Sequence, residues 1–182
     1  MNAEMSDWAA KVASITADAG TRPGSEFIER SIGSLLRIVR EHLKLDVVFV
    51  GEFVDGQRVF RQISSGAQSF FKAGQSHSLE ETVCQRIVDG RVPHLLHDVA
   101  GVRTMYGMPD YFQHVEVHIG VPVRFTDGAL YGVLCGFSRG ACPHLDDRDV
   151  RRLAMAAVAT ARLLAQADGY EISPAAQSGV AA

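Results

Sequence analysis

The stretch that decides the fold is VEVHIGVPV at residues 115–123, followed by DG at 127–128 and ALYGVLCGF at 129–137. In the first segment the valines and the isoleucine occupy every second position, with Glu116 and His118 among the residues between them. This period of two is typical of a β-strand with one apolar face. Asp-Gly favours a hairpin turn, so the third segment is predicted to return antiparallel to the first.

Two amphipathic helices are predicted on either side of the central part of the chain. Apolar side chains recur at helical spacing over residues 26–43 and again over 147–166. Asp146 is a good N-cap for the second helix, and Asp149 three residues later forms an acidic analogue of a capping box. Each helix carries a single apolar stripe, which needs a surface to pack against.

The elements between these helices mix strands, loops and one short helix. In chain order we predict a strand at 45–53, a turn at 54–56, a strand at 57–63, a loop at 64–77, a helix at 79–88, a strand at 93–97 and a loop at 98–114. Hairpin-connected strands with helices segregated around them indicate an α+β fold. Residues 1–24 are interpreted as an N-terminal extension with a short helix, and 168–182 as a flexible C-terminal tail.

Composition excludes several classes of protein. The chain has 182 residues, 47% of them hydrophobic, and a formal net charge of -3. This composition supports a sizeable core and disfavours binding to nucleic acid. No apolar run approaches the roughly 18 residues that a membrane span needs, and the N-terminus lacks the pattern of a signal peptide. Three sparse cysteines (Cys84, Cys135 and Cys142) fit reduced thiols, and we expect a cytoplasmic protein.

Two local patterns resemble the GAF domain family. The first is Leu79-x-x-Thr82-x-Cys84-x-x-Ile87-Val88 with RVP at 91–93, and the second is IGVPV at 119–123 with GVL at 132–134. The resemblance covers about residues 25–167 and is strongest to GAF domains of bacterial signalling proteins. It implies an antiparallel sheet of five to six strands, with terminal helices packed on one face and a ligand pocket on the other.

The resemblance also implies a sensory domain that binds a small molecule and signals through a homodimer or a partner protein. The 98–114 loop would cover the pocket, and His118 and Glu116 would form its floor, although His118 also fits a hydrogen-bonded core residue. The candidate ligand-binding residues are Cys84, His97, Asp98, Arg103, Tyr106, Tyr111, His114, Glu116 and His118. The sequence does not specify a ligand or cofactor. The homodimer would use the apolar stripes at 26–43 and 147–166. The alternative is that both stripes are buried by packing within one chain.

The sequence favours other functions less. Neither an HExxH nor a paired CxxC motif occurs, so no metal site is expected. The Cys-His pair through which related domains attach a bilin is also missing. A free methionine sulfoxide reductase is the enzymatic alternative, because Cys84 resembles one of that family's cysteines. No second cysteine lies between Asp98 and Val117, so catalysis is not the expected function. A module without a ligand that binds only other proteins is the third reading.

Overall fold

A computed structural model describes residues 3–19, 24–66, 71–107 and 113–167. Its elements are α1 (Ala3–Ala19), α2 (Ser25–Leu43), β1 (Val47–Val54), β2 (Gln57–Ser65), β3 (Ser76–Ser78), a 3₁₀ turn (Leu79–Glu81), α3 (Val83–Val88), β4 (Leu95–Leu96), α4 (Val99–Tyr106), β5 (Val117–Arg124), β6 (Leu130–Ser138) and α5 (Asp147–Ala167). Six strands form one antiparallel sheet in the order β3-β2-β1-β6-β5-β4. The predicted α+β fold is therefore confirmed. The tail predicted at 168–182 lies outside the described residues.

The hairpin predicted at residues 115–137 forms β5 and β6, of which β6 is a central strand and β5 lies next to the edge strand β4. β5 and β6 pair antiparallel, with Val121 opposite Leu134. Gly128 takes a φ of 88° at the turn, a conformation that glycine adopts without steric cost. β1 pairs with the other edge of β6, so β6 is hydrogen-bonded to a neighbouring strand along both edges.

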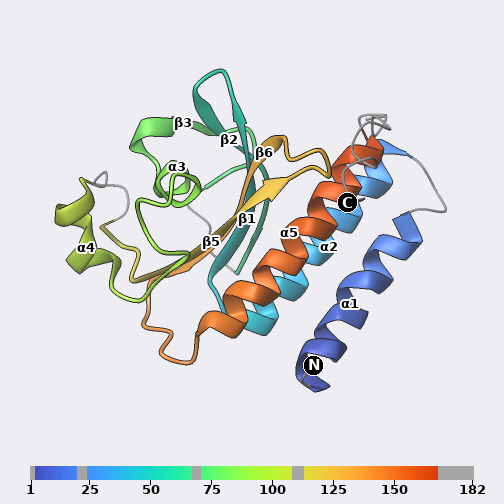
Figure 1. The fold of residues 1–182 in the computed structure, drawn as a ribbon, viewed down its shortest axis with the longest axis horizontal. Helices are drawn as coiled ribbons and strands as arrows, with labels where there is room; N and C mark the ends of the chain where they lie inside the picture. The colour runs from blue at the N-terminus through green and yellow to red at the C-terminus, as the bar shows by residue number, and fades with distance from the viewer. Residues whose placement is uncertain (1–2, 20–23, 67–70, 108–112, 168–182) are drawn as a thin grey trace, which may run out of the picture.

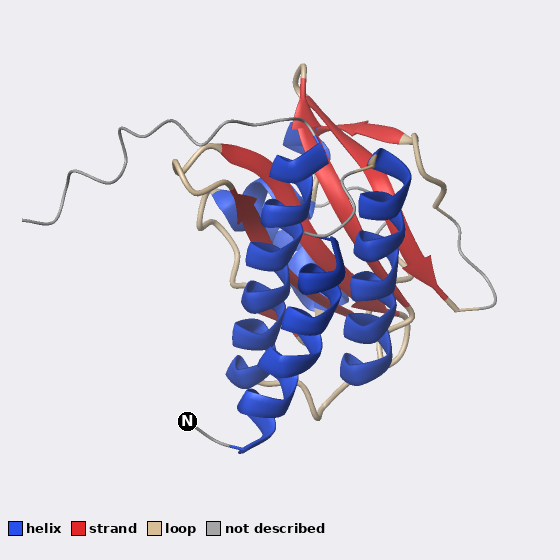
Figure 2. Ribbon diagram, turned by 90° about the vertical axis from the view of Figure 1, so that its right-hand side faces the viewer, coloured by secondary structure: helices blue, strands red, loops and turns tan. Residues whose placement is uncertain are grey.

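The two terminal helices of the main domain cover one face of the sheet. Figures 1 and 2 show α2 and α5 lying side by side across the strands. The predicted capping pair begins α5, where the Asp146 carboxylate accepts the backbone N–H of Arg148 and the Asp149 carboxylate accepts that of Asp146. α2 begins one residue earlier than the predicted range, with Gly24 at the N-cap position and Ser25 as the first residue of the helix.

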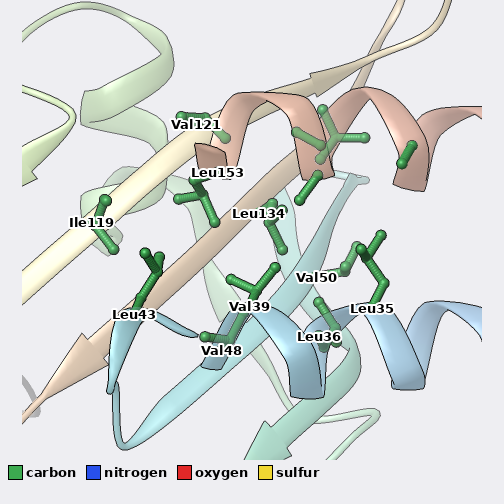
Figure 3. Packing of buried hydrophobic residues seen from close by; sticks show 14 of the residues in the cluster. Leu35, Leu36, Val39, Leu43, Val48, Val50, Ile119, Val121, Leu134 and Leu153 are labelled. Atoms are coloured by element: carbon green, nitrogen blue, oxygen red, sulfur yellow. The ribbon is translucent and has the colours of Figure 1, made fainter. Parts of the chain in front are cut away.

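Aliphatic side chains fill the space between these helices and the sheet. Figure 3 shows leucines and valines of α2 and α5 interlocking with residues from β1, β5 and β6. Leu35, Leu36, Val39, Leu134 and Leu153 are fully buried there. Burying each such side chain contributes roughly 1.5–3 kcal/mol, so this layer is the main source of stability.

The N-terminal helix α1 lies on the far side of α2 and α5 from the sheet (Figure 1). Its Trp8 is buried, and the indole N–H donates to the backbone carbonyl of Arg152 on α5 at 3.0 Å. The Trp8 ring also stacks on His42 of α2, with ring centroids 4.7 Å apart. The apolar stripes of α2 and α5 are therefore in contact with the sheet on one side and with α1 on the other.

The opposite face of the sheet carries a second cluster, covered by α3 and α4 (Figure 1). The predicted helix at 79–88 is wrong in its first half. Thr82 has an extended backbone and divides the 3₁₀ turn from α3. Its hydroxyl caps α3 by accepting the backbone N–H of Gln85. The predicted loop at 98–114 contains the helix α4, which begins after Asp98 and ends at Gly107.

Candidate functional site

Arg58 on β2 is the centre of the second cluster. Its side chain is 2% exposed, and its guanidinium carbon lies 4.0 Å from the ring centroid of Phe60 and 5.3 Å from that of Phe49. A desolvated cation over aromatic rings is stabilised by roughly 2 kcal/mol. The aromatic rings hold the guanidinium beneath α3, and they offset only part of the cost of burying its charge.

A β-bulge explains why a charged side chain enters this face. The register between β1 and β2 shifts between Val50 and Gly51, so that Phe60 faces Gly51 but Gln62 faces Val50. Arg61 is left as the extra residue, and its side chain is exposed. Arg58 and Phe60 therefore share the inner face of the second cluster, while Gln62 turns toward α2 near Gly33.

The polar partners of Arg58 are a histidine and a cysteine. One guanidinium nitrogen donates to Nδ1 of His77 at 2.7 Å, and the other lies 3.5 Å from Sγ of Cys84. His77 must accept this bond on a neutral ring, in keeping with a pKa that burial and the Arg58 charge lower. Within the described part of the chain, Arg58 has no carboxylate ion-pair partner and its Nε has no hydrogen bond.

Cys84 faces a second thiol across the cluster. It is the second residue of α3, and its Sγ lies 3.9 Å from Sγ of Cys135 on β6. Both sulfur-bearing side chains are fully buried. The hydrogen bond from Cys135 and the nearby Arg58 charge lower the pKa of Cys84 to about 7, although burial opposes this shift. Burial and the neighbouring Cys84 raise the pKa of Cys135 well above its ordinary value.

His118 lies on the inner face of β5, where the alternation of the strand places it. Burial, reinforced by the Arg58 charge, lowers its pKa to about 3, so the ring is neutral at physiological pH. It lines a small cavity of about 10 Å³ with Arg58. The remaining lining residues are Phe49, Phe60, Phe71, Val115 and Phe137. A cavity of this size holds about one water molecule.

Helix α4 closes one side of the cluster, with only one buried residue of its own, Val99. Val102 and Tyr106 are half-buried against the cluster. Arg86 of α3 reaches across to donate to the backbone carbonyl of Gly107, which ends α4. Nη1 of Arg103 is buried without a hydrogen-bond partner among the described residues.

The structure brings only some of the predicted ligand-binding residues together. Cys84 and His118 lie in the centre of the second cluster, and Tyr106 lies at its edge. The His97 and Asp98 side chains are exposed, and the Asp98 carboxylate caps α4 by accepting the N–H of Gly101 at 2.7 Å.

Two further predicted residues belong to a different place. His114 and Glu116 line a separate open hollow with Gln113, Val115 and Arg139. Tyr111 lies outside the described residues. His114 precedes β5 and is exposed, which is why it does not reach the cavity that His118 lines.

Sequence reasoning missed the residue on which the cluster is built. Arg58 stands two positions before Phe60, and residues two apart in a strand point to the same face. The sequence therefore indicated that a charged side chain would lie beside an aromatic one. His77 was missed because it reaches Arg58 only through the pairing of β3 with β2, which places the two opposite each other. Phe49 and Phe60 carry no sequence signal that sets them apart from other strand residues.

Other surface features carry less chemistry. A larger, open hollow of about 780 Å³ lies between the start of α2, Arg61 and Tyr131, and the end of α5. The charged side chains that line it (Glu26, Glu29, Arg30 and Arg61) are all exposed.

Over the described ranges, no group of three or more His, Cys, Asp or Glu side chains is placed to hold a metal ion. No helix in the same ranges is long and apolar enough to cross a membrane.

Comparison with known proteins gives one consistent answer on the fold. The sequence profile of the GAF domain matches residues 29–165. The GAF domain of an Acinetobacter phosphoenolpyruvate-protein phosphotransferase is 14% identical, with a TM-score of 0.71 over 93% of this chain and 97% of that one. A phycocyanobilin-bound GAF domain from a cyanobacterial phytochrome is 17% identical, with a TM-score of 0.70 over 91% and 98%.

An enzyme shares the same architecture. Free methionine-R-sulfoxide reductase from Neisseria meningitidis, solved in complex with its substrate, is 15% identical, with a TM-score of 0.66 over 93% of this chain and 95% of that one. At such identities the likeness concerns the fold alone. The comparison with curated protein sequences returned no match.

Proposed function

Because this chain belongs to the GAF domain family, we propose that it is a sensory domain that binds a small organic anion at Arg58. The observation that carries the proposal is the buried guanidinium without a carboxylate partner among the described residues. Burying a cation is costly unless an opposite charge accompanies it. A carboxylate entering the second cluster would supply that charge.

The surroundings of Arg58 favour a particular kind of anion. A guanidinium is suited to planar, bidentate recognition of a carboxylate. The other lining groups are mainly aromatic and aliphatic, with the neutral His118 as an additional hydrogen-bonding group. A carboxylate attached to a small apolar body therefore fits this lining better than a highly charged phosphate ester.

Binding would require the cavity to enlarge. Its present volume of about 10 Å³ is too small for an organic acid. Helix α4 packs against the same cluster without lining the cavity itself, and it is the element that we propose to move, because Val99 is its one buried residue and Met105 on its outer side is 75% exposed. We propose that the ligand selects an opened arrangement of α4, as in a population shift.

The signal would leave through the helical layer. β1, β5 and β6 carry the second cluster on one face and contact α2 or α5 on the other. We propose that displacement of these strands changes how α2 and α5 pack, and that a second copy of the chain or a partner protein senses the change. A homodimer would use the outer side of α5, where Val158 is 52% exposed. The cytoplasm remains our proposed location, since the three cysteines are free thiols.

Isothermal titration tests the proposal. The panel is acetate, benzoate, short branched-chain carboxylic acids and inorganic phosphate, and the proteins are the wild type, Arg58→Met and Arg91→Met. Arg91 makes an exposed ion pair with Asp89, so its variant controls for loss of a positive charge. We expect at least one carboxylate to bind the wild type and the control, and its affinity to fall at least about tenfold in Arg58→Met. Absence of binding throughout the panel, or equal binding by Arg58→Met, would overturn the proposal.

The second candidate is a thiol-dependent reductase, and the Cys84–Cys135 pair is the observation that favours it. A reductase of this class needs a nucleophilic thiolate and a second thiol that resolves the oxidised form. Turnover of free methionine sulfoxide by the wild type with a thiol reductant, and its loss in Cys84→Ser, would establish this activity in place of the sensory one.

A further inference from the structure

Cys84 and Cys135 come from distant parts of the chain and face each other in the second cluster. Their sulfur atoms are 3.9 Å apart, one on α3 and the other on β6. The neighbouring strand makes room for them, since a Cβ placed on Gly120 of β5 would lie 2.7 Å from Sγ of Cys135 and 2.8 Å from Cδ1 of Ile87. The absence of a side chain at residue 120 thus lets α3 approach the sheet closely enough for the two thiols to meet.

The two thiols differ in their electrostatic surroundings. Cys84 receives a hydrogen bond from Cys135 and lies 3.5 Å from the Arg58 guanidinium, an arrangement that stabilises a thiolate on Cys84. The pKa of Cys84 falls to about 7, while that of Cys135 rises. A thiolate beside a neutral thiol is the arrangement in which one sulfur attacks an oxidant and the other then closes a disulfide.

From this geometry we infer that Cys84 and Cys135 form a peroxide-oxidisable dithiol, with Cys84 as the attacking sulfur and Cys135 as the resolving one. Cys84 attacks one oxygen of hydrogen peroxide, which breaks the O–O bond, forms a sulfenic acid on Cys84 and releases water. The Cys135 thiol then attacks the Cys84 sulfur, and the sulfenic oxygen leaves as a second water. Two thiols lose two electrons and two protons in total, and one peroxide is reduced to two waters.

The structure allows this bond with a small movement. The sulfur atoms must close from 3.9 Å to about 2.05 Å. α3 is a helix of six residues that the extended Thr82 separates from the preceding turn, and we expect α3 to supply this movement. Neither cysteine lines the small cavity beside Arg58 and both thiols are fully buried, so peroxide would reach Cys84 only when α3 moves.

Cys142 provides an internal control. It is also buried, but it belongs to the cluster under α2 and α5, and its thiol faces the backbone carbonyl of Gly140 at 3.6 Å. Burial alone therefore does not distinguish Cys142 from the other two cysteines, whereas the facing sulfur and the guanidinium do. The inference does not depend on the proposed anion, because thiol oxidation is measured without any ligand.

The experiment treats the full chain with hydrogen peroxide in slight excess, then counts free thiols after denaturation and maps cysteine peptides by mass spectrometry. We expect the wild type and Cys142→Ser to lose two thiols and to yield one peptide pair linked through Cys84 and Cys135. Cys135→Ser should instead accumulate a sulfenic acid on Cys84 that dimedone traps, and Arg58→Met should slow the oxidation at least about tenfold through its higher thiol pKa.

The wild-type peptide map needs no variant to fold, so the inference can be decided on the native protein. A disulfide that includes Cys142, oxidation of Cys84 beyond the sulfenic acid without a link to Cys135, or no thiol loss in the folded protein would each overturn it. Dithiothreitol should restore both thiols in the wild type, and a failure to do so would also contradict a disulfide.

Discussion

The two faces of the sheet bury similar numbers of strand residues but differ in chemistry. The face under α2 and α5 is packed with leucine, valine, isoleucine and alanine. The face under α3 and α4 holds Arg58, His118 and two thiols among its aromatic and aliphatic residues. One face lowers the free energy of the folded state, and the other holds groups that cost stability unless something compensates them.

This difference follows from alternation along the same strands. In β5, Ile119 points to the helices while His118 points to the second cluster, and in β6, Leu134 and Cys135 divide in the same way. Function and stability are therefore encoded in neighbouring residues on opposite faces. A substitution on one face should leave the property of the other face nearly unchanged, and the following predictions test that separation.

The largest expected effect is on the face under α2 and α5. Leu153→Ala should lower the free energy of unfolding by ~2–5 kcal/mol, because Leu153 is fully buried and a cavity would remain. Denaturation in urea measures the change, and Met105→Ala on the exposed side of α4 is the control. A loss below about 1 kcal/mol would show that this layer repacks, and the contrast between the faces would then be weaker than we describe.

A large substitution on the other face should not lower the stability. Arg58→Met should leave the free energy of unfolding unchanged or raise it by ~1–4 kcal/mol, since methionine fills much of the volume without burying a charge. Urea denaturation of the ligand-free protein is the measurement. A loss of more than about 2 kcal/mol would mean that the bonds to His77 and Cys84 make the guanidinium a structural group.

The pH dependence of stability should report the second cluster. The pKa of His118 is about 3 in the folded protein against an ordinary value of 6.5, so between these values the unfolded chain binds more protons than the folded one. Stability should therefore fall as the pH is lowered from about 6.5, by at most ~1.4 kcal/mol per pH unit for this residue.

Two histidine variants isolate that contribution. His118→Gln should flatten the dependence between pH 6.5 and 5, whereas His97→Gln, on an exposed side chain, should leave it unchanged. Lowered pKa values at His77 and His42 act in the same direction and remain in both variants. Parallel curves for the wild type and His118→Gln would show that His118 titrates normally.

The smallest effect is expected at the outer surface of the helical layer. Val158→Glu should change the free energy of unfolding of the monomer by no more than about 0.5 kcal/mol, because Val158 is half exposed. Sedimentation equilibrium on the same variant tests the proposed homodimer. Wild-type protein that sediments as a monomer at high micromolar concentration would contradict the dimer, and a dimer insensitive to the substitution would have to use another surface.

Much of the fold could be predicted because the decisive signals are local. The Asp-Gly turn, the helical stripes and the alternation from Val117 onwards each arise from backbone geometry that short segments express. The prediction that Val115 shares the face of Val117 is wrong, because β5 begins at Val117 and Val115 packs in the second cluster with His118. The division of His118 from its valine neighbours followed from the same alternation. The break at Thr82 was less predictable, since Ser78 and Thr82 are both good cap residues and only the packing of α3 selects between them.

The candidate site was only partly predictable because it depends on contacts between distant segments. The bulge between β1 and β2 sets which face Arg58 occupies. No residue type near Gly51 indicates that a bulge forms there. The contact of Cys84 with Cys135 joins residues 51 positions apart. Asp98 is a predicted ligand-binding residue, but its carboxylate caps α4, a helix within the segment predicted to be a loop.

The buried Trp8 is an intrinsic fluorescence probe. It is the only tryptophan in the sequence, and it lies in the helical layer, across the sheet from Arg58. A ligand bound beside Arg58 would not touch the indole, so it could change the emission of Trp8 only by altering how α1 rests on α2 and α5. Fluorescence during a titration would therefore measure transmission through the sheet separately from occupancy.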